Sequence, residues 1–183
     1  MSDWEGYAVR LRERFDYVNT FYHQEPRLDI CDIEPRLEGR YDFVITSEVF
    51  EHVPPPVSTA FVNLRRLLSP GGVAVVTVPY GLQDETVEHF PDLHDYELVT
   101  EEGRTVLRSV TRSGEVRIFH DLVFHGGPGE TLEMRRFSER GLVSEFERAG
   151  FVDVHIHRDG NPVYGIGWPE PWSLPITARA PAR

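Results

Sequence analysis

The sequence predicts an α/β fold, and three observations carry this prediction. Two continuously apolar runs, at residues 43–45 and 73–78, are typical of strands that are buried on both faces of a parallel sheet. Between them, the apolar side chains of residues 57–68 lie at helical spacing, and Ser69-Pro70-Gly71-Gly72 ends that pattern. A strand, a helix and a second buried strand predict a right-handed crossover within one sheet.

The residues before this unit predict a helix and two short strands. Residues 4–15 place apolar side chains on one helical face, with charged residues between them, so we expect an amphipathic helix. Residues 15–21 are rich in aromatic and β-branched side chains and predict a short strand. A second brief strand is expected around residues 28–31.

The stretch from about residue 83 to residue 125 predicts a small antiparallel β insert. Its first part, residues 83–104, is strongly acidic, which is typical of a solvated surface. Two turn signals, Glu102-Gly103 and Ser113-Gly114, separate β-rich runs at 96–100, 105–111 and 115–119. The glycine loop at 126–129 lacks the Lys and Ser or Thr of a phosphate-binding loop. We therefore expect its glycines to shape the loop and not to bind a phosphate.

The carboxyl-terminal part returns to the α/β pattern. Ser138 is a good helix cap, the apolar residues after it line one helical face, and Gly150 ends the helix. Strands are expected at residues 152–157 and 174–180.

Net charge, the length of the apolar runs and the cysteine count argue against some classes of partner and location. Thirty acidic residues against 19 basic ones give a formal charge of −11, which argues against a nucleic-acid partner because phosphates are bound by clustered Lys and Arg. The sequence shows no apolar run long enough to span a bilayer and no signal-peptide pattern, so we expect no membrane role. The single cysteine, Cys31, forms no internal disulfide, and a cytoplasmic location is expected.

Three motifs carry a family resemblance. The runs YDFVITSEVFEHV, LRRLLSPGGVAVVTVP and FSERGLVSEFERAGFVDVHIH follow one another in the order and spacing of class I S-adenosylmethionine-dependent methyltransferases, which the chain resembles from about residue 4 onward. The resemblance implies a Rossmann-like sheet in strand order 3-2-1-4-5-7-6, with the last strand antiparallel, in a single methyltransferase-like domain spanning 1–183. The run VFHGGPGETLEMRRFS also resembles a subgroup associated with sugar or glycan biosynthesis.

The resemblance also implies cofactor-binding residues. Asp29 matches the acidic residue that reads the adenine amino group, and Ile30 would offer a backbone amide. Thr46, Ser47 and Glu48 match the strand end beside the methionine part of S-adenosylmethionine. Simpler interpretations stay open: Asp29 or Asp32 caps a turn, and Glu48 and Glu51 are favoured by the dipole in the first turn of a helix.

Two histidines are the candidate catalytic residues. His52 matches a position that borders the methyl-transfer cleft, where an imidazole suits removal of a proton from a hydroxyl acceptor. The alternative is a polar residue that fills the strand-to-helix turn. His125, with His120, is expected to line the same cleft from the insert. We expect no metal site, because no H-E-x-x-H spacing is present.

The family's first strand and its G-x-G-x-G loop are not recognisable before residue 15. The sequence therefore predicts an amino-terminally truncated sheet, explained either by a start placed too late or by a shortened domain that has abandoned cofactor binding. Since the central strand would be missing, strands 2 and 4 either close on each other or borrow a strand from a partner chain or a second copy in a homo-oligomer.

These observations lead to two main hypotheses. The first is a methyltransferase that methylates an oxygen of a small polar or sugar-like acceptor. The alternative is a catalytically silent interaction or scaffolding protein of the same fold. A nucleotide-sugar or nicotinamide enzyme ranks third, because it too needs a glycine fingerprint.

Overall fold

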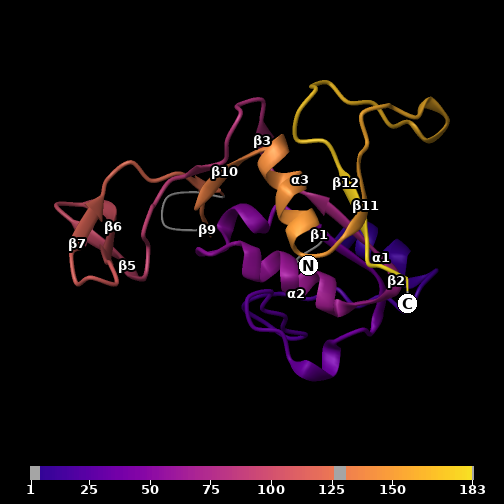
Figure 1. The fold of residues 1–183 in the computed structure, drawn as a ribbon, viewed down its shortest axis with the longest axis horizontal. Coiled ribbons are helices and arrows are strands. Elements are labelled where there is room, and N and C mark those ends of the chain that lie inside the picture. The colour runs from indigo at the N-terminus through magenta and orange to yellow at the C-terminus, as the bar shows by residue number, and fades with distance from the viewer. Residues whose placement is uncertain (1–4, 126–130, 183) are drawn as a thin grey trace.

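The main sheet of the protein has four strands and confirms the predicted α/β class. The computed structural model describes residues 5–125 and 131–182, and the strand order is β1-β2-β12-β11. Strand β1 (Tyr41–Ser47) runs parallel to β2 (Leu68–Thr77). Strand β12 (Ile176–Arg179) is antiparallel both to β2 and to β11 (Val152–Ile156). Figure 1 shows these strands beside one another.

This order corresponds to the 4-5-7-6 part of the expected seven-stranded sheet, including its antiparallel last strand. Strand β1 stands at the edge of the sheet, and none of the strands in the described part of the chain pairs with its outer side. Consequently the 3-2-1 part of the expected order is not seen within residues 5–125 and 131–182.

Two helices cover the sheet and pack against each other. Helix α2 (Ser58–Leu67) and helix α3 (Glu139–Arg148) meet through Phe61 and Phe146, whose rings lie 5.0 Å apart edge to face. The predicted caps of α3 are confirmed: the Ser138 hydroxyl accepts from the backbone N–H of Gly141, and Gly150 has a positive φ of 85°. No helix of the described residues is long and apolar enough to cross a membrane.

The amino-terminal segment contains a helix but lacks the predicted strands. Helix α1 (Glu5–Arg12) confirms the amphipathic helix, whose expected first residue, Trp4, lies outside the described residues. The strands expected at 15–21 and 28–31 are wrong, since the only pairing there is an isolated bridge between Phe21 and Arg27. Phe15 and Tyr17 instead place their rings on Phe43 of β1, with centroids 5.2 and 6.2 Å away. The aromatic side chains of residues 15–21 therefore reflect packing against β1 and not membership of a strand.

The predicted meander is present as a separate three-stranded sheet. Strands β5 (Asp95–Glu101), β6 (Arg104–Val110) and β7 (Val116–Phe119) are antiparallel and confirm the three β-rich runs. Figure 1 shows this sheet at one end of the molecule, away from both chain ends. Leu107 of β6 belongs to a second buried apolar cluster, together with Phe90, Leu93, Leu132 and Met134 from the segments around the meander. The division into one domain of 1–183 with an insert at 83–125 remains a proposal.

Short strands connect the meander to the main sheet, and the sequence did not predict them. They are β3 (Tyr80–Gly81), β4 (Val87–Glu88), β8 (Phe124–His125), β9 (Thr131–Leu132) and β10 (Arg135–Ser138). Strand β10 pairs with both β3 and β4, and β8 pairs with β9. The glycine loop predicted at 126–129 lies outside the described residues. Among the described residues there are also three 3₁₀ turns: η1 (Pro35–Leu37), η2 (Phe50–His52) and η3 (Pro162–Tyr164).

Candidate functional site

The turn after β1 differs from the strand-to-helix turn that the sequence predicted. Helix α2 begins only at Ser58, and the 3₁₀ turn η2 stands between it and β1. Prolines 54–56 explain the delay, because a residue that precedes a proline avoids the helical conformation. Glu51 lies in the first turn of η2 and Glu48 lies before it, so the expectation that both carboxylates occupy the first turn of a helix holds for Glu51 alone. Glu48 instead adopts a positive φ of 51°, which is uncommon for a residue other than glycine.

A buried arginine from β10 holds this turn in place. Arg135 is fully buried and donates from Nη1 to the carbonyl oxygens of Phe50 and Val53, at 2.9 and 2.6 Å. Its Nε donates to Glu88 Oε1 at 2.7 Å. The backbone N–H of Met134 donates to the carbonyl oxygen of Glu51 at 2.7 Å. The orientation of η2 is thus set by a strand far away in the sequence.

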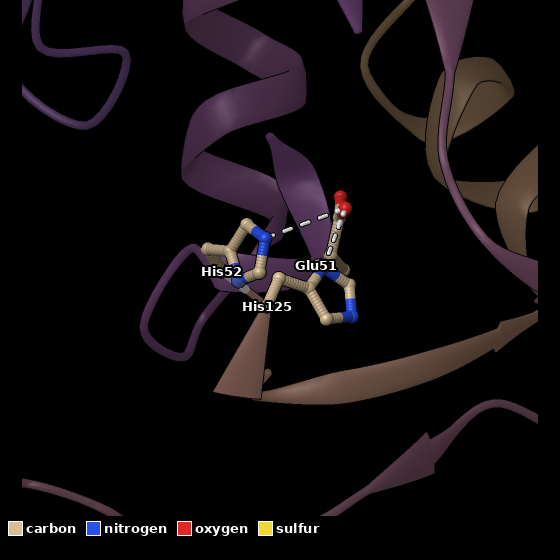
Figure 2. A group of neighbouring side chains, drawn as sticks. All are labelled: Glu51, His52 and His125. Atoms are coloured by element: carbon tan, nitrogen blue, oxygen red, sulfur yellow. Dashed lines mark ion pairs between the residues drawn. The ribbon is translucent and has the colours of Figure 1, made fainter. Parts of the chain in front are cut away.

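The turn directs Glu51 and His52 toward His125 on β8, as Figure 2 shows. Oε1 of Glu51 lies 3.5 Å from Nε2 of His52 and 3.8 Å from Nδ1 of His125. The two imidazole rings meet edge to face with centroids 4.7 Å apart. The structure therefore brings the two predicted catalytic histidines together, and it adds a carboxylate between them. We call these three residues the Glu51 cluster.

Burial dominates the electrostatics of the Glu51 cluster. The Glu51 side chain is 0% exposed, and neither carboxylate oxygen has a hydrogen-bond partner on another residue in the described part of the chain. Burial raises the pKa of Glu51 to about 8, and the negative charges of Glu48 and Glu133 add to this rise. Burial also lowers the pKa of His52 from its usual 6.5, so His52 is mainly neutral at pH 7.

Hydrogen bonds to outer partners fix the rings of both histidines. Nδ1 of His52 lies 2.8 Å from the carbonyl oxygen of Leu132. Because a carbonyl only accepts, His52 donates from Nδ1 and keeps its lone pair on Nε2, facing Glu51. Nε2 of His125 lies 2.9 Å from Glu133 Oε2, and the other Glu133 oxygen lies 2.7 Å from Nε2 of His89. An imidazole that donates to Glu133 from Nε2 directs the lone pair of Nδ1 toward Glu51.

The predicted adenine-reading residues form a turn. Oδ1 of Asp29 accepts from the backbone N–H of Cys31 at 2.9 Å, and Oδ2 lies 3.6 Å from Nη2 of Arg27. Ile30 is buried, and its carbonyl oxygen accepts from Nδ2 of Asn63 at 2.8 Å. This geometry agrees with the simpler interpretation of Asp29 as a turn-capping residue, and the cofactor role of Asp29 and Ile30 stays a prediction.

The other predicted cofactor residues lie at the end of β1, beside the cluster. Thr46 is buried, whereas Ser47 is half-buried and Glu48 is exposed. The backbone N–H of Glu48 donates to the carbonyl oxygen of Thr77 at 2.9 Å, which continues the pairing of β1 with β2. His120, in contrast, is exposed and is not part of the Glu51 cluster.

Sequence reasoning missed the residues that support the cluster. It considered Glu51 only as a helix-terminus carboxylate and Glu88 only as part of an acidic surface, and it did not consider Arg135, Glu133 or His89. For Glu133 and Arg135 the visible signal is the concentration of charged residues in ETLEMRRFS, a stretch that is otherwise patterned like a strand, whereas Glu88 and His89 lie in the acidic stretch 83–104. This signal does not show which of those charges are buried.

A groove lies beside α3, and none of the three residues of the Glu51 cluster lines it. It has a volume of about 380 Å³. Polar side chains predominate in its lining, among them Asp84, Glu85, Thr86, Glu88, Ser138 and Arg140. None of the seven predicted site residues lines this groove.

Fold and site together define an α/β protein whose candidate site lies after a parallel sheet strand, the usual place for ligand sites in such sheets. The methyltransferase domain family matches residues 8–156 of the chain. The chain therefore belongs to the methyltransferase domain family, as its three motifs predicted. Among curated proteins, none matches the chain.

Several solved structures are similar to this chain at low identity. An S-adenosylmethionine-dependent methyltransferase from Mesorhizobium loti is 17% identical, with a TM-score of 0.44 over 84% of this chain and 68% of that one. The sugar N-methyltransferase KedS8 from a Streptoalloteichus species is 18% identical, with a TM-score of 0.46 over 85% and 61%. CalS10, an amino pentose methyltransferase from Micromonospora echinaspora, is 19% identical, with a TM-score of 0.43 over 84% and 63%. The chain spans about two thirds of the length of these proteins.

Proposed function

We propose that this chain acts in S-adenosylmethionine-dependent methyl transfer to an oxygen of a small polar, sugar-like acceptor. The observation that carries the proposal is the Glu51 cluster at the end of β1, in a chain that belongs to the methyltransferase domain family. The single free cysteine, Cys31, supports a cytoplasmic location as part of the same proposal.

The end of β1 fits one part of the cofactor. Thr46, Ser47 and Glu48 offer hydroxyl and carboxylate groups there, and the positive φ of Glu48 is a backbone outlier of the kind that occurs at functional sites. The described residues contain no G-x-G-x-G loop after a strand, so the candidate contacts are those beside the methionine part together with Asp29 and Ile30 toward the adenine. When bound, S-adenosylmethionine supplies an electrophilic methyl group.

His52 is suited to take the proton of the acceptor hydroxyl. Its ring is held by the hydrogen bond to Leu132, and the lone pair of Nε2 is available because burial keeps the imidazole neutral. His125 is 36% exposed and so borders the opening of the cluster toward solvent. We propose that His125 positions the acceptor.

Calorimetric titration of the chain with S-adenosylmethionine and S-adenosylhomocysteine tests cofactor binding. We expect a dissociation constant tighter than about 100 μM, equivalent to roughly −5.5 kcal/mol. Asp29→Ala should weaken binding if Asp29 reads the adenine, whereas Asp32→Ala, in the same turn, serves as the matched control. Unchanged affinity in Asp29→Ala would remove Asp29 from the site and leave the function standing.

Transfer of a labelled methyl group to a panel of hydroxylated sugars tests the reaction. We expect His52→Ala to lower the rate by about 10²-fold or more, the usual contribution of a general base. A variant that keeps the wild-type rate and pH profile would exclude His52 as the base.

The second candidate is an interaction protein that does not bind the cofactor. Two observations favour it: Asp29 is engaged within its own turn, and β1 is an edge strand among the described residues. Such an edge suits pairing with a partner chain or a second copy. A folded sample that gives no heat with millimolar cofactor supports this candidate, and sedimentation then shows whether the chain self-associates.

A further inference from the structure

Three side chains that carry lone pairs converge on one point between η2 and β8. The ligand atoms of Glu51, His52 and His125 all lie within 4.8 Å of one another. We propose that these three residues bind a divalent first-row transition-metal cation, such as Zn²⁺. The proposal stands on the geometry of the cluster. A bound cation occupies the lone pair of His52 Nε2, so the general-base role given to His52 applies to the metal-free chain.

The separations between the three ligand atoms suit a zinc ion. Ligands at about 2.1 Å from a tetrahedral zinc ion lie roughly 3.4 Å from one another. The corresponding separations from Glu51 Oε1 are 3.5 Å to His52 Nε2 and 3.8 Å to His125 Nδ1. Figure 2 shows both rings turned toward the same carboxylate. Only small side-chain shifts are needed to bring all three atoms onto one cation.

The outer hydrogen bonds are those of metal-binding histidines. Such a histidine usually donates its second ring N–H to a backbone carbonyl or a carboxylate, which fixes the tautomer and the ring orientation. His52 has this arrangement with the carbonyl of Leu132, and His125 has it with Glu133. His89 in turn orients Glu133. Two of the three ligands are therefore held with their free lone pairs directed inward.

The buried carboxylate points to the same conclusion. Both oxygens of Glu51 are buried without a hydrogen-bond partner on another described residue, although a buried polar group is costly to leave unpaired. With the tautomers above, the histidine atoms that face Glu51 are acceptors as well. A single proton satisfies only one contact between these three groups, whereas a cation satisfies all of them. The nearby carboxylates of Glu48 and Glu133 also make the surroundings favourable for positive charge.

The ligand types select the class of metal. Imidazole suits zinc, iron, copper and nickel, whereas magnesium and calcium prefer oxygen ligands. Two histidines and one carboxylate also leave at least one coordination position open, as in catalytic zinc sites. His125 is the most exposed of the three, so the open position has access to solvent.

This proposal departs from the sequence-based expectation of no metal site. That expectation weighed His120 and His125 and searched for closely spaced ligands. The cluster instead joins two adjacent residues on η2 to a residue on β8, and the fold alone brings them together.

A second histidine pair in the same molecule provides a matched control. His155 and His157 on and after β11 also meet edge to face, with ring centroids 4.7 Å apart. Nε2 of His157 lies 3.0 Å from the Thr177 hydroxyl, and no carboxylate contact of this pair is seen in the described residues. This pair therefore serves as the control for metal binding by two neighbouring imidazoles without a buried glutamate.

Metal binding is tested on the untagged 183-residue chain after dialysis against a chelator. Zinc is titrated against a chromophoric competitor, and Co²⁺ is added separately so that its visible absorption reports the ligand geometry. We expect one equivalent of Zn²⁺ and a four- or five-coordinate Co²⁺ spectrum, with Mg²⁺ failing to compete. Absence of stoichiometric Zn²⁺ and Co²⁺ binding by the folded chain would overturn the proposal, as would equal binding of Mg²⁺.

Substitutions then locate the site. Glu51→Gln and His125→Gln should each weaken Zn²⁺ binding by more than about 100-fold, and the supporting Glu133→Gln by about 10 to 100-fold. His155→Gln should leave binding unchanged. Circular dichroism establishes that each variant is folded, and the partly exposed His125 keeps the test available if Glu51→Gln does not fold. Wild-type affinity in folded His125→Gln, or loss of affinity in His155→Gln, contradicts the assignment. Because no methyl donor is present, failure here leaves the proposed methyl transfer untouched.

Discussion

Arg135 donates from Nη1 to the carbonyl oxygen of Val53 at 2.6 Å, across a separation of 82 residues in the sequence. This hydrogen bond and the one to Phe50 tie β10 to the turn that carries Glu51 and His52. The guanidinium is buried, and its ion-pair partner, Glu88, is partly exposed. The position of the candidate site therefore depends on one cation that is remote from it in the sequence.

Replacing Arg135 by Leu should be strongly destabilising. The change leaves two buried carbonyl oxygens without a donor and removes the partner of Glu88, and breaking a buried charged contact costs about 3 to 5 kcal/mol. Urea unfolding measures the loss. Arg136→Leu is the matched control, because Arg136 is the exposed neighbour on the same strand, and it should change the free energy of unfolding by less than about 0.5 kcal/mol. Equal effects of the two substitutions would contradict the role given to Arg135.

Asn63 should hold the turn that contains Asp29 and Ile30. Its buried side chain donates to the Ile30 carbonyl at 2.8 Å, so Asn63→Ala leaves that oxygen unpaired at a cost of about 1 to 3 kcal/mol. Hydrogen exchange should show faster opening of residues 28–33. Thr59→Ala, on the exposed side of the same helix, controls for helix propensity. Unaltered exchange in the 28–33 segment of Asn63→Ala would show that the turn stands without this bond.

The reactivity of Cys31 should depend on pH differently in the folded and unfolded chains. Burial raises the pKa of its thiol above 9.0, and the negative charge of Asp29 adds to this. Since the thiolate is the reactive form, the midpoint of the alkylation rate should lie at higher pH in the native chain than in urea. The unfolded chain releases this proton first, so the same shift lowers stability as the pH rises above 9.0. A native midpoint at or below the unfolded one would refute the assignment.

Zinc should raise the thermal stability of the chelator-treated chain if the cluster binds it. A ligand that binds only the folded state at 100 times its dissociation constant stabilises by about 2.7 kcal/mol. Scanning calorimetry with and without Zn²⁺ measures this shift, and later addition of chelator should reverse it. The shift should disappear in His125→Gln and persist in His155→Gln. A shift of equal size in both variants would assign the effect to adventitious binding elsewhere.

The meander and helix α3 were predicted correctly because the turn and cap residues that define them lie within a few positions of each element. The meander followed from two turns, and both glycines there have positive φ values, 77° at Gly103 and 86° at Gly114. The boundaries of α3 followed from Ser138 and Gly150, which act within one helical turn of the helix. Such signals depend little on the rest of the fold, so sequence reasoning identifies them.

The failures concern residues whose role depends on distant partners. The aromatic residues at 15–21 matched a strand in composition, yet Phe15 and Tyr17 pack on Phe43 through their rings. Glu51 seemed an ordinary carboxylate, since its burial depends on the segments from β8 to β10 that cover it. The structure brings His52 and His125 together, but nothing in the sequence indicates that Glu51 lies between them.

The hydrogen bond between His52 and Leu132 closes a chain segment of 80 residues. Closing a flexible loop of that length costs roughly 4 kcal/mol of chain entropy, a cost that contacts elsewhere have to offset first. We therefore expect the cluster to assemble late in folding, after the sheet and the meander have formed. A spectroscopic probe placed at His125 would report the completion of the native fold, and early intermediates would lack the site altogether.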